Sequence, residues 1–354
     1  MNSISLRILP AIALLLVAAC GEQKVDTSQG SEASTDTTAA LVERAGAPLF
    51  DGMSDYEMPI TTQNADAQRY FNQGMVLAFA FNHAESIRSF RAAQTLDPSC
   101  AMCFWGEALA TGPNINVTSK GKVIMSAAER EAAFSALQQA LALKANATPR
   151  EQAYIEALAT RYNGQPETDR EPLDRAWAQA MGKVAKQYPE DMTAASIYAE
   201  SLMNTMPWNY WSDDGIAKPE TSAVIESLDR VLEAEPDHPL ALHLYIHALE
   251  ASNDPGRAEA AADRLANLVP GAGHLVHMPS HIYYRVGRYN DAALANQRAA
   301  DVDEAYIAAC NAQGFYPALY YPHNIHFLWS AATMQGQSAL SIESARRVVA
   351  NVRV

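Results

Sequence analysis

The chain has 354 residues, of which 49% are hydrophobic and 19% charged, and its formal net charge is −14 at pH 7. A chain of this length can bury a sizeable core. Its negative charge would repel a phosphate backbone, which excludes nucleic acid as an expected partner.

The first predicted element is an export signal over residues 1–20. Its apolar run, Ile8 to Val17, is too short to cross a bilayer. The sequence VAAC that ends at Cys20 resembles a bacterial lipobox, which implies that Cys20 becomes a lipidated N-terminus and anchors the protein to a membrane. Ordinary cleavage at the small residues is the alternative, and it also exports the chain. Gly21 stands where an aspartate would favour the inner membrane, so we expect the outer membrane, facing the periplasm.

The next predicted element is a tether. Residues 21–60 are rich in Ser, Thr, Asp, Glu, Gln and Ala and contain few large apolar residues. Such a segment cannot bury enough apolar surface to become ordered. We therefore expect a disordered tether between the lipid and a folded domain over residues 61–354.

The folded domain begins with a helical repeat over residues 67–100. Positions 4, 8, 11, 20, 24, 27 and 32 of a 34-residue unit hold Tyr70, Gly74, Leu77, Ser86, Phe90, Ala93 and Pro98. This pattern resembles a tetratricopeptide repeat. Small residues at positions 8 and 20 let two antiparallel helices approach, larger residues fill the gap, and proline ends the second helix.

The same frame recurs with varying fidelity along the rest of the chain. Including the first, about seven repeats are expected, and the other six cover residues 101–143, 149–189, 192–236, 239–272, 273–306 and 322–354. No strand-like alternation interrupts them, so we predict an all-α fold, a right-handed solenoid of antiparallel helix pairs. The last repeat has no polar capping helix, so we expect another repeat or another chain to cover its apolar face.

Two long connections, 111–123 and 206–219, interrupt helix pairs, and loops of this length are usually functional or disordered. The second contains Trp208, Tyr210 and Trp211, which fit either a binding lid or a local packing plug.

Cys100 and Cys103 form a C-x-x-C motif at the start of the second repeat. Phe104 stands where a c-type haem site requires histidine, which excludes that cofactor. In an oxidising compartment a disulfide between the two is expected. A redox or metal-relay thiol pair is the alternative. This pairing leaves Cys310 without a partner. A disulfide between Cys310 and one of the other two cysteines is a further alternative.

Histidines supply the main functional signal, because seven of the nine lie between residues 243 and 326. Within each helix they are three or four residues apart, which places side chains on one helix face. They are His243, His247, His274, His277, His281, His323 and His326. The resemblance implies that their repeat positions line the concave groove. Imidazoles converging from three helices predict a transition-metal site for copper, zinc or iron, with nickel also compatible.

Seven imidazoles are more ligands than one tetrahedral metal ion can bind. Either two ions lie side by side with about three histidines each, or one ion is bound and the other histidines support it. Glu250 is a candidate ligand or general base, and Tyr284 a candidate catalytic phenol on the same face. Pro279 is expected to break the helix that carries three of the histidines. His83 and His238 are interpreted as packing or surface residues.

Three functions are compatible with this pattern. The preferred one is a lipid-anchored metalloprotein that performs oxidative or hydrolytic chemistry on a small molecule or peptide in the groove. The second is a copper- or zinc-binding protein without catalysis. The third is an interaction scaffold that organises envelope proteins. For the seven histidines themselves, the alternative to a metal site is a peptide-binding groove that uses imidazole as a hydrogen-bonding surface. The sequence has no H-E-x-x-H, phosphate-loop, G-x-S-x-G or dinucleotide motif, so it assigns no reaction.

Overall fold

The computed structural model describes residues 38–116, 125–165 and 169–351. The chain divides into two units, residues 1–41 and 42–354, which are treated separately. In the first unit only residues 38–41 are described, and they are helical. The predicted signal peptide, Cys20 and the first part of the predicted tether lie outside the described residues.

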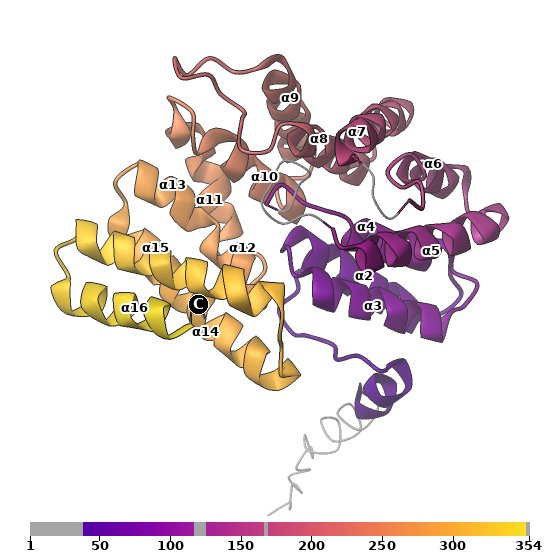
Figure 1. The fold of residues 1–354 in the computed structure, drawn as a ribbon, viewed down its shortest axis with the longest axis horizontal. Coiled ribbons are helices and arrows are strands. Elements are labelled where there is room, and N and C mark those ends of the chain that lie inside the picture. The colour runs from indigo at the N-terminus through magenta and orange to yellow at the C-terminus, as the bar shows by residue number, and fades with distance from the viewer. Residues whose placement is uncertain (1–37, 117–124, 166–168, 352–354) are drawn as a thin grey trace, which may run out of the picture. The chain divides into compact units, whose positions relative to one another are not determined.

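The second unit is built from helices (Figure 1). Its described residues contain no strand, apart from one isolated bridge between Trp211 and Ala217. The prediction of an all-α fold of helix pairs is confirmed. The α-helices are α2 (Ala65–Phe79), α3 (His83–Leu96), α4 (Ala101–Thr111), α5 (Ala127–Leu143), α6 (Pro149–Leu158), α7 (Arg170–Gln187), α8 (Met192–Thr205), α9 (Pro219–Ala234), α10 (Pro239–Leu249), α11 (Glu259–Leu265), α12 (Gly273–His277), α13 (Pro279–Arg285), α14 (Tyr289–Cys310), α15 (Tyr321–Met334) and α16 (Ser338–Asn351).

Consecutive helices pack against each other, with α2 on α3, α4 on α5, α7 on α8 and α15 on α16. Short helical turns join some of them, namely η1 (Lys144–Asn146), η2 (Pro255–Ala258) and the π-helical η3 (Tyr316–Tyr320). The ranges expected for the repeats begin at, or within two residues of, the starts of seven helices, namely α2, α4, α6, α8, α10, α12 and α15. Residues 273–306 depart from the pattern, because α12 and α13 together take the place of one first helix.

Two glycines let the first helices pack closely around the ring of Phe90, which is fully buried. A Cβ atom on Gly74 would lie 2.8 Å from Phe90 Cε1, and one on Gly106 would lie 2.3 Å from it. Both distances are too short for real contacts. The repeat pattern therefore has a direct packing cause, since small residues on α2 and α4 leave room for one aromatic ring from α3.

We expect Gly106→Ala to destabilise the protein by about 1–3 kcal/mol, because overpacking outweighs the higher helix propensity of alanine. Urea unfolding followed by circular dichroism measures the change. Gly256→Ala is the matched control, because its Cβ would meet no atom closer than 3.6 Å. Equal midpoints for Gly106→Ala and the wild-type chain would contradict this packing account.

The later part of the expected tether is ordered, which corrects the boundary at residue 60. Phe50 donates its backbone N–H to Gln73 Oε1 at 2.8 Å. The Thr61 N–H donates to Glu151 Oε1 at 2.6 Å. Polar side chains on the helices satisfy backbone groups of this segment. A few apolar side chains anchor it as well, since Met58 is buried and the Phe50 ring packs on Tyr306.

The helical array also contacts itself between positions far apart in the sequence. The Phe79 carbonyl, at the end of α2, lies 2.6 Å from His243 Nδ1 on α10. Asn116, after α4, donates to the Tyr320 hydroxyl at 3.1 Å. These contacts enclose the inner faces of α10 and α12.

Cys100 and Cys103 form a disulfide with a Cα–Cα distance of 5.4 Å, while Cys310 is a free, half-buried thiol. None of the helices in the described ranges is long and apolar enough to span a membrane.

Candidate metal centre

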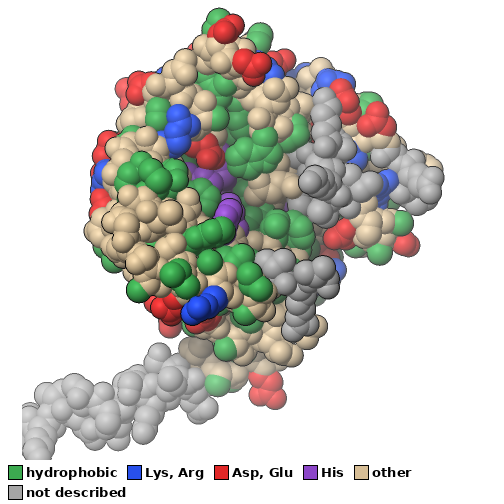
Figure 2. All heavy atoms as spheres, turned by 60° about the vertical axis from the view of Figure 1, so that its left-hand side comes forward, with side chains coloured by type: hydrophobic (Ala, Val, Ile, Leu, Met, Phe, Trp, Pro, Cys, Tyr) green, Lys and Arg blue, Asp and Glu red, His purple; other side chains and the backbone are tan. Residues whose placement is uncertain are grey.

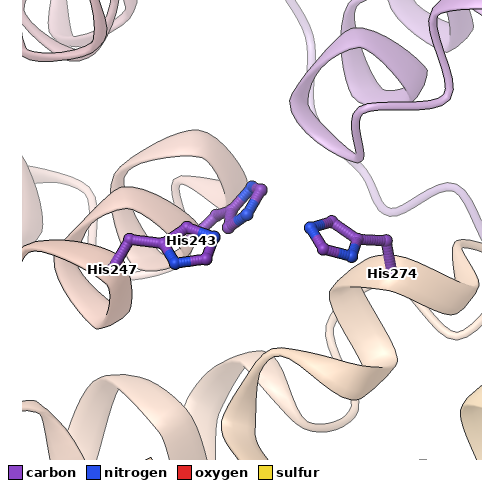
Figure 3. Close-up of side chains that lie close together, drawn as sticks. All are labelled: His243, His247 and His274. Carbon is purple, nitrogen blue, oxygen red and sulfur yellow. The ribbon is translucent and has the colours of Figure 1, made fainter. Parts of the chain in front are cut away.

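Three neighbouring elements bring the histidines together. His243 and His247 lie one turn apart on α10, and their rings face His274, which projects from α12 (Figure 3). The chain changes direction after His277, and Pro279 occupies the first turn of α13, where its missing N–H costs no helix bond. The predicted break at Pro279 is therefore present.

Six of the seven predicted ligands fall into two groups of three. The ring nitrogens of His243, His247 and His274 lie within 4.8 Å of one another. Those of His277, His281 and His323 satisfy the same limit. Among the described residues, no fourth histidine, cysteine or acidic side chain joins either group.

Hydrogen bonds fix the ring tautomers in the first group. His243 Nδ1 lies 2.6 Å from the Phe79 carbonyl oxygen, and His247 Nδ1 lies 2.7 Å from Glu250 Oε1. Both Nδ1 atoms therefore donate, which leaves the Nε2 atoms with lone pairs. Among the described atoms, these two buried Nε2 atoms and both ring nitrogens of buried His274 have no hydrogen-bond partner. Such unpaired buried atoms are unfavourable unless a ligand satisfies them.

The second group has the same arrangement. His277 Nδ1 lies 2.6 Å from Asn296 Oδ1, and the Asn296 amide is oriented by donating to the Ala292 carbonyl at 2.7 Å. His281 Nδ1 lies 2.7 Å from Glu250 Oε2. With both Nδ1 atoms donating, His277 Nε2 and His281 Nε2 lie only 2.9 Å apart.

That separation suits a shared cation. Two imidazole nitrogens bound to one ion at about 2.0–2.1 Å lie about 3.3 Å apart in a tetrahedral site and about 2.9 Å apart where the two bonds meet at right angles. Two neutral rings would otherwise point lone pairs at each other. A proton between them would make one ring an imidazolium, and burial and the neighbouring His281 oppose that charge on His277 by lowering its pKa.

Burial also favours the neutral form of four further imidazoles. It is the main reason that the pKa values of His243, His247 and His274 lie below the usual range, and nearby histidines lower them further. Burial also lowers the pKa of His323 to about 3. Neutral imidazole is the form that binds metal ions.

Glu250 connects the two groups. Burial alone would raise the pKa of Glu250, but His281 and His247 outweigh it and lower that pKa. Each carboxylate oxygen accepts one Nδ1–H, so Glu250 orients one imidazole in each group. Both oxygens are engaged, which fits a supporting carboxylate better than the general base or ligand expected from sequence.

Two predicted site residues lie outside the cluster. His326 is exposed on α15, with its ring 5.3 Å from that of Trp329. A step of three residues leaves two side chains about 60° apart around the helix axis. On α15 this offset places His323 at the edge of the buried face and His326 on the exposed face. The Tyr284 hydroxyl accepts a hydrogen bond from Ser330 at 3.1 Å. The Phe327 ring lies 4.5 Å from His281 and 6.3 Å from Tyr284, so Tyr284 packs behind an aromatic layer, which does not support a catalytic role.

His83 and His238 are hydrogen-bonded structural residues. His83 Nδ1 lies 2.5 Å from the Ala110 carbonyl oxygen, and its Nε2 lies 2.9 Å from Asn114 Nδ2. His238 caps α10, because its Nδ1 accepts the Ala241 N–H at 3.3 Å. Neither residue belongs to a group of converging ligands in the described part of the chain.

His238 makes the stability depend on pH. Burial lowers its folded-state pKa to about 4, so the unfolded chain binds more protons between about pH 6.5 and 4. Stability is therefore lost as the pH falls through this window. Asparagine keeps a side chain that can cap the helix. Between pH 7 and 4.5 we expect the free energy of unfolding of His238→Asn to fall by about 2.5 kcal/mol less than that of the wild-type chain.

Urea unfolding at the two pH values, with a chelator present, measures this difference. His326→Asn, on an exposed histidine, is the control and should lose as much stability as wild type. If His238→Asn loses as much unfolding free energy as this control, His238 does not cause the pH dependence of the stability.

Aromatic side chains surround the imidazoles. Phe81 adopts a left-handed backbone conformation (φ 56°), uncommon for a bulky residue, and its ring lies 4.5 Å from His243. Phe81 also lines a cavity of about 340 Å³ that includes His83 and Asn114. Strain of this kind persists where surrounding packing holds the residue in place.

The loop over residues 206–219 also packs beside the histidine cluster. Trp211 Nε1 donates to the Ala248 carbonyl at 2.8 Å, and Tyr210 is buried. Trp208 remains 52% exposed while its ring lies 5.1 Å from His247. Figure 2 shows histidine side chains at the floor of a hollow, with hydrophobic and acidic side chains around it.

Several residues that shape the centre were not predicted. Asn296 and the Phe79 carbonyl orient imidazoles, and Trp208 and Phe81 pack against them. Trp208 was noted from the sequence as part of a binding lid or a packing plug, but its contact with His247 was not predicted. A backbone carbonyl contributed from a distant repeat leaves no signal in the sequence.

Comparisons with known proteins do not identify a family or a function for this chain. No family profile and no curated protein matches this chain. A solved structure of the human IFIT1 dimer with PPP-AAAA is 11% identical, covers 90% of this chain and 78% of that chain, and has a TM-score of 0.36. At this level of similarity, the human protein's properties do not carry over.

Proposed function

We propose that this chain is a transition-metal protein whose buried imidazoles bind copper, zinc or iron. One observation carries the proposal: His277 Nε2 and His281 Nε2 face each other at 2.9 Å while both Nδ1 atoms donate elsewhere. The unpartnered nitrogens of His243, His247 and His274 support the same conclusion. Imidazole-rich sites suit these metals and not magnesium or calcium.

We also propose that the ions take part in oxidative or hydrolytic chemistry on a small molecule or peptide. Three protein ligands leave a coordination position open, which is typical of catalytic sites. A bound ion would supply Lewis acidity or redox chemistry there. The hollow in Figure 2 offers an approach from solvent. The chain's own part is to hold neutral imidazoles in place and to keep Glu250 ionised between them.

Metal binding without catalysis is the second candidate. One observation favours it, namely that both Glu250 oxygens are hydrogen-bonded, so this carboxylate is not free to take a proton from substrate. A peptide-binding scaffold is less well supported, because His243 and His277 are fully buried and offer no surface to a peptide.

We place the protein in the bacterial cell envelope, anchored through lipid on Cys20 and facing the periplasm. The lipobox-like sequence that ends at Cys20 supports this proposal. Replacing Cys20 with serine should release the chain from the membrane fraction in fractionated cells. Persistence in that fraction would refute lipid anchoring.

Elemental analysis of the purified chain tests the metal proposal. After reconstitution with copper, iron and zinc in separate samples and removal of free metal, at least one metal should be retained per chain. Metal content well below one per chain in all three samples would refute it. Turnover of a redox dye or an ester by loaded protein, and not by chelated protein, would separate catalysis from binding alone.

A further inference from the structure

We infer that the centre holds two ions side by side, one bound by His243, His247 and His274 and the other by His277, His281 and His323. This inference rests on the proposed function and specifies its site. It assigns each ion three imidazoles and gives Glu250 to neither as a ligand.

The distances favour two ions over one. Ligand atoms bound to a single ion at about 2.0–2.1 Å lie at most about 4.2 Å apart. In the described residues the six imidazoles form two sets of three that meet a 4.8 Å limit, and no larger set meets it. A single ion could therefore use only one set and would leave the other set's inward nitrogens unsatisfied.

The break between α12 and α13 explains how one stretch of chain serves both ions. His274 lies in the first turn of α12 and faces α10 (Figure 3). His277 is the last residue of that helix, and its Nε2 lies 2.9 Å from His281 Nε2 on α13. The rings of His274 and His277 are 5.7 Å apart, and those of His247 and His281 are 5.3 Å apart. The two groups are thus adjacent without sharing an imidazole.

A third set, His247, Glu250 and His281, also meets the distance limit. Its contacts are already explained, because both carboxylate oxygens lie 2.7 Å from an Nδ1 atom that donates. An ion at this place would displace both hydrogen bonds and turn the imidazoles away from their groups. We therefore assign Glu250 the role of orienting one ring for each ion, as a positioning residue.

Cobalt(II) titration of the full chain tests the inference. The visible absorption of bound cobalt should saturate at two equivalents. His274→Ala and His323→Ala should each saturate at one, because each removes a ring that makes no hydrogen bond with the described part of the chain. His326→Ala, on the same helix as His323, is the matched control and should keep two.

Trp208 reports on the first group separately, because its ring lies 5.1 Å from that of His247. Cobalt should quench its fluorescence in wild type and in His323→Ala, and not in His274→Ala. The Trp208→Phe variant identifies this part of the signal, and a cooperative thermal transition shows that each variant is folded.

Each outcome decides one claim. Saturation of wild type at one equivalent overturns the two-ion inference and leaves the proposed function standing. Loss of both equivalents in folded His274→Ala or His323→Ala also overturns it, since the groups would then form one site. Absence of cobalt binding in wild type overturns the proposed function itself.

Discussion

A chain that carries His247→Gln together with His277→Gln is expected to lose almost all of its bound metal. Each substitution removes one of three imidazoles from a group, and glutamine is a poor ligand for copper, zinc or iron. Glutamine also approximates the size of the ring, so the buried positions stay filled. Elemental analysis after reconstitution should fall from two ions per chain to well below one.

The matched control replaces His83 and His326, which lie outside both groups. The double variant His83→Gln and His326→Gln removes the same number of imidazoles and should retain full metal content. If both double variants lose metal equally, retention does not depend on the inner cluster. If neither loses metal, the ions are bound elsewhere.

Glu250→Gln is expected to weaken metal binding by about 10–100-fold at both groups. The carboxylate accepts Nδ1–H bonds from His247 and His281, and an amide has only one oxygen to accept them. One of the two imidazoles would lose its orienting partner, and neither would face a negative charge. Competition with a chelator of known affinity measures the change.

Glu226→Gln is the control, because Glu226 is exposed on α9. It should bind metal as wild type does. If Glu250→Gln binds metal as tightly as this control, Glu250 does not support the ligands. If it abolishes binding entirely, Glu250 is a ligand, as one sequence-based alternative held.

The sequence predicted the helical repeats well because their determinants are local. Gly74, Phe90 and Pro98 occupy fixed positions in a 34-residue pattern, and each has a direct packing or helix-ending role. The same periodicity predicted His243, His247 and His274 on inward-facing positions. It failed at His326, because a three-residue step on α15 carried that ring to the exposed face.

The features that the sequence did not predict depend on contacts between residues far apart in the chain. The carbonyl that orients His243 comes from Phe79, 164 positions earlier in the chain. The sequence made Glu250 a candidate ligand or general base, and only the approach of α13 to α10 shows that its two oxygens accept from two rings. The extended segment around Phe50 looked like tether because its partners are polar side chains of distant helices.

Anomalous diffraction from crystals of zinc- or copper-loaded protein tests the central claim most directly. Data collected on both sides of the metal's absorption edge locate the ions without any assumption about their ligands. Our account predicts two peaks, one among His243, His247 and His274 and one among His277, His281 and His323. Fully loaded crystals whose peaks lie only at surface carboxylates, or at His326, would contradict it.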